Sequence, residues 1–200
     1  MVPPVPVSGL CTRSTNQWTA GLPNLVGVLS PCEDQRLNGP TGPVFETEPM
    51  QDAVRFRGPI NARLYTSSTS GNGMLSVSVS SVAPDGRVER ITGGWQVISH
   101  RALDESRSRF LGGELIQPRH PFTRAAQSLL EPGEVAPIDV EVFPTGAVIP
   151  AGHRLWVAVQ AFDVPHLLPT LPDAVGSASL MTIHASEEHP SRITLPTIPS

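Results

Sequence analysis

The amino-acid sequence predicts an all-β fold, an antiparallel β-sandwich, and three observations support this prediction. The 200 residues include 22 prolines and 17 glycines, which interrupt helices and mark the turns between strands. Several short segments alternate apolar and polar residues with the period of two that is typical of a β-strand. No segment shows a convincing helical period, and short strands at near-regular spacing are typical of a sandwich.

The first 43 residues are expected to form an irregular connecting arm that packs loosely on one β-sandwich domain over residues 44–200. The arm has few periodic apolar positions and many Pro, Gly, Ser and Asn residues. Its start, Met1–Pro6, lacks the basic region and apolar core of a signal peptide. If the protein is exported, its signal is therefore expected upstream of this chain.

Both cysteines, Cys11 and Cys32, lie in the arm. A disulfide between them would add roughly 3 kcal/mol of stability and would indicate an oxidising, extracellular compartment. The alternative is two free thiols in a cytosolic protein. We favour the disulfide, because thiol ligands of zinc would need His or Cys companions at short spacing and none is nearby.

The first strands of the domain are expected at Val54–Phe56 and Ala62–Thr66. Gly58 and Pro59 separate them, and this pair predicts a turn because proline cannot sit inside a central strand.

The clearest strand is Met74–Val82, in which apolar residues alternate with serines. This pattern predicts one buried face and one face in water. The strand ends at the turn Pro84–Gly86, and Arg87–Thr92 is expected to return beside it as a hairpin.

Residues 93–130 are predicted to form a long irregular segment between strands, which includes Trp95. Irregular segments of this length are uncommon inside compact domains and are often functional or lie at interfaces.

Alternation resumes at Ile138–Phe143, where Asp139 and Glu141 are expected to face water. After turns at Pro144–Gly146 and Pro150–Gly152, both alternating sets of His153–Phe162 are largely apolar, which predicts a strand covered on both faces, with Trp156 in the core. The last expected strands are Ala178–His184 and Arg192–Leu195.

Several kinds of chemistry have no support in this sequence. All 14 basic side chains are arginines, so a phosphate-binding loop with lysine, a Schiff base and a Ser-x-x-Lys pair are excluded. The Gly-x-Ser-x-Gly motif of α/β-hydrolases is also absent. We therefore assign no catalytic residue, although a triad whose members meet only in the fold is not excluded by spacing.

Charge and hydropathy argue against two classes of partner. The net charge is −4 and no basic block contains interleaved aromatic residues, so we expect no nucleic-acid partner. No apolar run approaches the roughly 18 residues of a membrane-spanning helix, so we expect no membrane partner. The six histidines are scattered and the aspartates are isolated, so neither a metal nor a cofactor is expected.

Six residues are candidates for contacts with a ligand or with another domain. Asp163 and His166 form a polar pair after the apolar strand, for which a structural or interface role is the main interpretation. Trp18 and Trp95 are expected in irregular segments, where an exposed indole could stack on a sugar or anchor a second domain. The other two candidates, His120 and Phe122, lie in the irregular segment 93–130.

An ordered set of segments resembles a known family. These segments are Phe45–Met50, Val54–Leu64, Val82–Gly86, Gly93–Arg101, Phe143–Gly146 and Ile149–Leu155. Over residues 45–195 they resemble the C-terminal domain of X-Pro dipeptidyl-peptidases and cocaine-esterase-like serine hydrolases.

The resemblance implies a jelly-roll sandwich, similar to galactose-binding-like domains, packed against an α/β-hydrolase domain earlier in the same chain. It also implies that the catalytic Ser, Asp and His belong to that earlier domain, so no catalytic residue is carried over to this sequence.

The leading hypothesis is therefore a non-catalytic module that shapes or stabilises the active site of a serine peptidase or acyl esterase. The substrate class stays open among proline peptides, esters and acylated β-lactams. The alternatives are a free-standing carbohydrate-binding sandwich that uses Trp18 or Trp95, and a structural oligomerisation domain.

Overall fold

The computed structural model describes residues 1–5, 36, 41–164, 166–167 and 179–199. Within these residues the chain is built from strands, with two short 3₁₀ helices, η3 (Ile98–His100) and η4 (Arg124–Ala126), and no α-helix. The all-β sandwich predicted from sequence is confirmed, whereas the finer likeness to galactose-binding-like domains stays a prediction.

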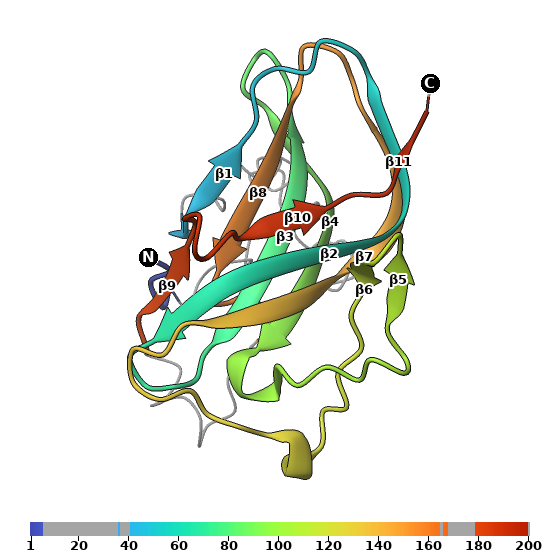
Figure 1. Cartoon of the computed structure of the whole chain (residues 1–200). Helices are drawn as coiled ribbons and strands as arrows, with labels where there is room; N and C mark the ends of the chain where they lie inside the picture. The colour runs from blue at the N-terminus through green and yellow to red at the C-terminus, as the bar shows by residue number, and fades with distance from the viewer. Residues whose placement is uncertain (6–35, 37–40, 165, 168–178, 200) are drawn as a thin grey trace, which may run out of the picture.

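One antiparallel sheet of nine strands forms the body of the domain (Figure 1). Its strand order is β1-β8-β3-β4-β7-β2-β10, and β9 and β11 also pair with β2. The strands are β1 (Val44–Glu46), β2 (Val54–Ser68), β3 (Met74–Val82), β4 (Val88–Val97), β7 (Ala136–Ile149), β8 (Arg154–Gln160), β9 (Met181–His184), β10 (Arg192–Thr194) and β11 (Thr197–Ile198). A separate hairpin consists of β5 (Arg109–Leu111) and β6 (Glu114–Gln117).

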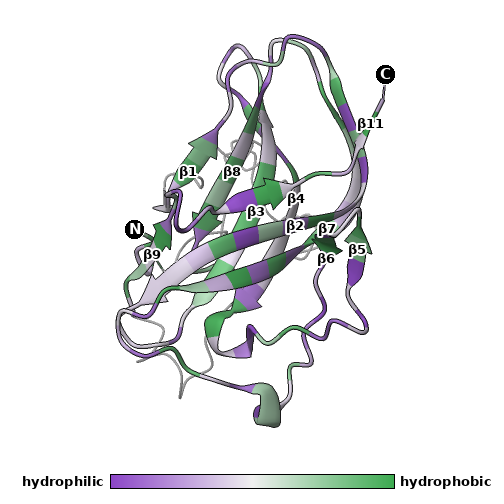
Figure 2. Ribbon diagram, viewed as in Figure 1, coloured by the Kyte–Doolittle hydropathy of each residue, from purple (hydrophilic) through white to green (hydrophobic). Residues whose placement is uncertain are grey.

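The sheet curls so that its apolar faces meet in a single core. Val77 of β3, Val159 of β8 and Val140 of β7 are all fully buried and belong to the same hydrophobic cluster. β4 joins the two halves of the curled sheet, because Gly94 of β4 pairs with Val142 of β7. Figure 2 shows hydrophilic and hydrophobic positions following one another along β2 and β7.

The predicted turn at Gly58-Pro59 is wrong, because β2 runs through this pair as one strand of 15 residues. The pairing of β2 with β7 passes from Gly58↔Thr145 to Ile60↔Val142, so Pro59 lies in a β-bulge where the ladder is interrupted. Pro144 of β7 lies opposite in the same interruption, so the predicted turn at Pro144–Gly146 is also part of a continuous strand. A proline within a strand is tolerated at a bulge because no ladder hydrogen bond needs its missing N–H.

The strand Met74–Val82 and its hairpin partner are confirmed as β3 and β4. The returning strand is longer than predicted, since it continues to Val97 and contains Trp95, which was expected in an irregular segment. The expected wet face of β3 is wrong, because Ser76 and Ser80 are only 1% exposed. The segment that follows β8 lies against this face, where Asp163 accepts a hydrogen bond from Ser76 Oγ, and the local alternation could not show this contact.

The later strands lie near the positions that the sequence predicted, but the exposure of some of their side chains differs from the prediction. β8 is covered on both faces as predicted, but Trp156 is half-buried and not in the core. Asp139, expected in water, is only 7% exposed, because the segment before β7 folds over it. The turn at Pro150–Gly152 is confirmed by the hydrogen bond from the His153 N–H to the Pro150 carbonyl oxygen.

The division into an arm over residues 1–43 and a domain from residue 44 stays a prediction. In the described part of the arm, Val2 is fully buried and pairs with Met181 of β9. No helix in the described ranges is long and apolar enough to cross a membrane.

Candidate functional site

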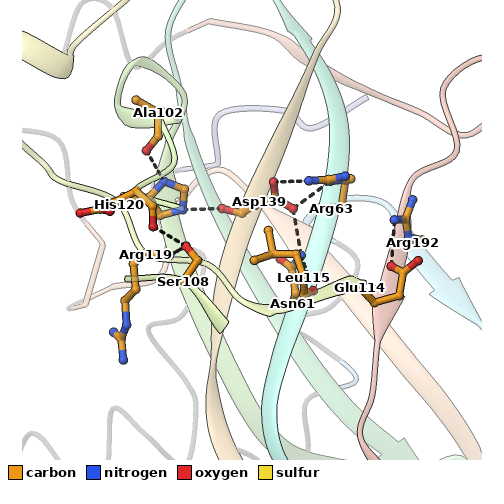
Figure 3. Close-up of polar contacts among 11 residues, drawn as sticks. Asn61, Arg63, Ala102, Ser108, Glu114, Leu115, Arg119, His120, Asp139 and Arg192 are labelled. Atoms are coloured by element: carbon orange, nitrogen blue, oxygen red, sulfur yellow. Dashed lines mark hydrogen bonds and ion pairs between the residues drawn. The ribbon is translucent and has the colours of Figure 1, made fainter. Parts of the chain in front are cut away.

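Residues 101–135, which we call the excursion, leave the sheet after η3 and return to it at β7. The irregular segment that the sequence predicted from residue 93 thus begins later, because β4 continues to Val97. The excursion carries the β5–β6 hairpin, η4 and the candidate residues His120 and Phe122. It folds back over the outer face of β2 and β7, and Figure 3 shows the polar contacts that hold it there.

Asp139 of β7 is the centre of these contacts. Its Oδ1 accepts hydrogen bonds of 2.9 Å from Asn61 Nδ2 and Arg63 Nε, and its Oδ2 accepts one of 2.8 Å from Arg63 Nη2. This two-pronged bond to the carboxylate raises the pKa of Arg63 above its ordinary value. Asn61 Nδ2 also donates to the Leu115 carbonyl oxygen of β6, so the buried carboxylate is connected to the hairpin through Asn61.

Three further polar contacts fix the excursion to the sheet. Glu141 of β7 accepts hydrogen bonds from Gln117 Nε2 at 2.7 Å and from Arg119 Nη1 at 2.9 Å. At the hairpin tip, Arg192 Nη2 donates to Glu114 Oε2 at 3.2 Å. The polar side chains on the outer face of β2 and β7 are therefore bonded to the excursion and do not form an ordinary solvated strand surface.

His120 links the start of the excursion to β7. Its Nδ1 lies 2.9 Å from the carbonyl oxygen of Ala102, and its Nε2 lies 2.9 Å from the carbonyl oxygen of Asp139. The first carbonyl belongs to the start of the excursion and the second to β7. The ring thus fixes the backbone at residue 120 against two segments that are far apart in sequence.

Phe122 is more than half exposed, at 59%, and its φ of 49° lies in the left-handed region. Among the described residues other than glycine, it is the one with a positive φ. A bulky side chain in this conformation costs on the order of 1–3 kcal/mol and persists only where the surroundings enforce it. Its ring lies 5.7 Å from that of His120 and 6.0 Å from that of His100, measured between centroids.

A second polar cluster lies around Asp163, which follows β8 and is only 1% exposed. Its Oδ2 accepts hydrogen bonds from Arg90 Nη2 and Trp95 Nε1, both at 2.9 Å, and from Ser76 Oγ at 3.4 Å. All three donors come from β3 and β4. The carboxylate therefore anchors the segment after β8 onto the serine face of the sheet.

Aromatic rings complete this cluster. The ring of His166 stacks on Trp95 with centroids 5.1 Å apart and an interplanar angle of 11°. Phe143 of β7 meets Trp95 edge-on with centroids 5.2 Å apart. Since Trp95 is half-buried, with a stacked face and a bonded Nε1, this position does not favour its use as a platform for sugar.

His166 has a lowered pKa, and this shift predicts how stability depends on pH. Its side chain is only 4% exposed, and burial lowers the pKa below 6.5; the charge of Asp163 opposes the shift and that of Arg90 reinforces it. The unfolded chain therefore binds this proton at a higher pH than the folded chain does. The contribution of the neutral His166 ring to the free energy of unfolding is complete above pH 6.5 and decreases as the pH falls below that value.

We therefore expect the wild-type chain to lose more unfolding free energy between pH 7 and pH 5 than the variant His166→Phe. The variant keeps an aromatic ring against Trp95 but cannot bind a proton. Urea unfolding at several pH values measures the difference, and parallel curves for the two proteins would contradict the predicted direction.

Two serine–histidine pairs meet in the fold, and each has the two groups that a nucleophile and its base would need. Ser67 Oγ lies 2.9 Å from His184 Nε2, and Ser81 Oγ lies 3.0 Å from His153 Nδ1. Neither histidine contacts a carboxylate among the described residues, so the acid of a triad is missing there. The same residues also contain no group of three or more His, Cys, Asp or Glu side chains placed to hold a metal ion.

A small apolar groove opens where the two edges of the curled sheet approach each other. Its volume is about 250 Å³, and it lies between Phe45 of β1, Leu64 of β2, Val157 of β8 and Ile193 of β10. The polar groups at its rim are already engaged: Ser191 Oγ donates to the His184 carbonyl oxygen and accepts from the Tyr65 N–H.

The six candidate residues of the sequence thus separate into two groups. Trp95, Asp163 and His166 meet in one cluster, and His120 and Phe122 lie together on the excursion. Trp18 and the pair Cys11 and Cys32 lie outside the described residues. Sequence reasoning missed Arg90 and Ser76, because hydrogen-bonding partners more than 70 residues away leave no local signal.

Comparison with known proteins extends this description. The family described as the X-Pro dipeptidyl-peptidase C-terminal non-catalytic domain matches residues 8–194. A protein named as a serine esterase from Mycobacterium bovis is 30% identical over 154 residues, which cover 77% of this chain and 23% of that protein. The cocaine esterase of a Rhodococcus species is 26% identical over 168 residues, which cover 77% of this chain and 25% of that enzyme. The chain spans about a quarter of the length of these relatives.

Solved structures show the same fold. A CocE/NonD family hydrolase from Staphylococcus aureus has a TM-score of 0.65 and 18% identity, over 80% of this chain and 31% of that one. An α-amino acid ester hydrolase has a TM-score of 0.62 and 19% identity, over 83% of this chain and 27% of that one. At these identities the likeness establishes the fold alone, and in both cases the matched region is less than a third of the solved chain.

Proposed function

Since the chain belongs to the family of X-Pro dipeptidyl-peptidase C-terminal non-catalytic domains, we propose that it is the accessory β-sandwich of a larger serine hydrolase. In this proposal an α/β-hydrolase domain, in the same polypeptide, carries the catalytic Ser, Asp and His. The sandwich then shapes or stabilises the active site of that domain and makes no bond itself.

The observation that carries this proposal is the family match over residues 8–194, nearly the whole chain. The lengths of the relatives support it, because the matched region is only 23–25% of two curated esterases. The sequence also lacks the Gly-x-Ser-x-Gly motif that carries the nucleophilic serine of α/β-hydrolases, which agrees with a catalytic serine located outside this chain.

The architecture suits an accessory role. The excursion is a long segment without a core of its own, yet buried polar groups hold it firmly on β2 and β7. It exposes the large apolar side chains of Phe110, Leu111, Phe122 and Leu129. A rigid surface of this kind can cover part of a neighbouring cleft, exclude water from it and limit which acyl groups enter.

We expect the purified chain to hydrolyse neither X-Pro p-nitroanilides nor p-nitrophenyl esters above the buffer rate. The physical reason is that the two Ser–His pairs lack an orienting carboxylate in the described part of the chain. Release of p-nitrophenol or p-nitroaniline, followed by absorbance, measures this. Turnover that disappears in Ser67→Ala or Ser81→Ala would overturn the non-catalytic assignment.

A second experiment tests the larger polypeptide directly. Sequencing the DNA upstream of the Met1 codon is expected to show an in-frame extension that encodes Gly-x-Ser-x-Gly followed by Asp and His partners. A stop codon without such an extension would contradict a catalytic domain in the same chain, and a free-standing sandwich would replace it.

A further inference from the structure

Phe122 combines three properties that the stability of the isolated domain does not require. Its ring is 59% exposed, its backbone is in the left-handed region at a φ of 49°, and it lies on a segment held rigidly against the sheet. Glycine or asparagine would adopt this backbone conformation at a lower cost than phenylalanine. A strained, exposed aromatic residue therefore points to a contact outside the described domain.

The backbone on both sides of Phe122 is fixed. Before it, the His120 ring lies within hydrogen-bond distance of the carbonyl oxygens of Ala102 and Asp139, and Pro121 restricts its own φ. After it, the turn of η4 begins, and the Ser128 N–H then bonds to the Ser99 carbonyl oxygen at 2.8 Å. The backbone of Phe122 is thus held from both sides, which lowers the conformational entropy that a partner must remove on binding.

Aromatic groups flank the ring. His100, at the end of η3, has its ring centroid 6.0 Å from that of Phe122. The ring of His120 lies on another side, with its centroid 5.7 Å from that of Phe122. We call His100, His120 and Phe122 the Phe122 surface.

We propose that the Phe122 surface is the anchor by which this module docks on the catalytic domain of the hydrolase that contains it. The inference rests on the proposed function, since it specifies which part of the sandwich meets that domain. The relatives favour this occupant over others, because about three quarters of each curated relative lies outside the matched region.

The exposed phenylalanine of the β5–β6 hairpin provides a matched comparison. Phe110 is 49% exposed and lies on the same excursion, but it has no positive φ. It has the same ring and similar exposure without the enforced conformation, so we assign it no anchoring role.

The test measures binding of the chain to the separately expressed hydrolase segment of the same polypeptide by titration calorimetry. We expect Phe122→Asn to raise the Kd about tenfold or more, as is typical for loss of an interface anchor, while Phe110→Ala changes it less than about twofold. Asparagine tolerates the left-handed region, so the melting temperature of the isolated Phe122→Asn chain should equal or exceed that of the wild type.

Each outcome separates this inference from the proposed function. If the wild-type chain binds the segment and Phe122→Asn binds equally well, the Phe122 surface is not the anchor although the module assignment stands. An equal loss in Phe122→Asn and Phe110→Ala would also overturn the inference, because any exposed ring would then serve. Failure of the wild-type chain to bind would overturn both, and a Phe122-dependent dimer in light scattering would identify a second copy as the partner instead.

Discussion

Asp163→Ala is expected to lower the free energy of unfolding by about 3–5 kcal/mol, the usual result of removing one partner from a buried ion pair. The carboxylate is 1% exposed and accepts hydrogen bonds from Arg90, Trp95 and Ser76. Without it, the Arg90 guanidinium, whose side chain is only 11% exposed, loses the partner that compensates its burial. Equilibrium unfolding in urea, followed by tryptophan fluorescence, measures the loss, and Trp95 reports on the site itself.

The ion pair between Glu114 and Arg192 is the control for Asp163→Ala. Its side chains are 58% and 44% exposed, so solvent screens the attraction and Glu114→Ala should cost less than about 1 kcal/mol. Asp163→Asn should lie between the two, because the amide oxygen still accepts hydrogen bonds but carries no charge. If Asp163→Ala costs no more than Glu114→Ala, the cluster does not anchor the segment after β8.

Gly94→Ala is expected to cost about 3 kcal/mol or more, because the added methyl group has no space at the seam of the sheet. A Cβ at this position would overlap the Glu141 carbonyl oxygen and lie 2.8 Å from the Val142 Cα. These are backbone atoms of β7, so they cannot rotate away as a side chain could. Because Gly94 pairs with Val142 where β4 meets β7, the two halves of the sheet would have to separate.

The matched control is Gly146→Ala in β7. The nearest atom to its added Cβ is Arg57 Cγ at 3.8 Å, which is an ordinary contact, so the change should stay within about 0.5 kcal/mol. Thermal unfolding of the two variants beside the wild type gives the comparison. Equal melting temperatures for Gly94→Ala and Gly146→Ala would show that β4 and β7 can separate without cost.

The elements that sequence predicted well are those whose signal is local. Within Met74–Val82, apolar residues alternate with serines from Leu75 to Ser80, and the structure places β3 at the bounds Met74–Val82. The turn after it contains Pro84, Asp85 and Gly86, which close a hairpin through the hydrogen bond from the Gly86 N–H to the Ala83 carbonyl oxygen. Here the pattern of side chains and the turn chemistry both act within a few residues.

The errors arose where a distant segment changes the environment of a strand. Gly58 and Pro59 read as a turn, yet the bulge opposite Pro144 lets β2 continue, and this depends on a strand about 85 residues later. Asp139 reads as solvated, but the excursion buries it beside Arg63 and Asn61. The candidate pair Asp163 and His166 was visible in the sequence, whereas Arg90 on β4 was not.

The sequence by itself determined the fold class, most strand positions, the family resemblance and the lack of a nucleophile motif, because propensity, alternation and motif spacing are properties of neighbouring residues. Only the tertiary structure decided which polar faces are buried, which donors meet Asp139 and Asp163, and how Phe122 is held. These depend on contacts between segments far apart in the chain, and such contacts form when the sheet curls and the excursion folds back over it.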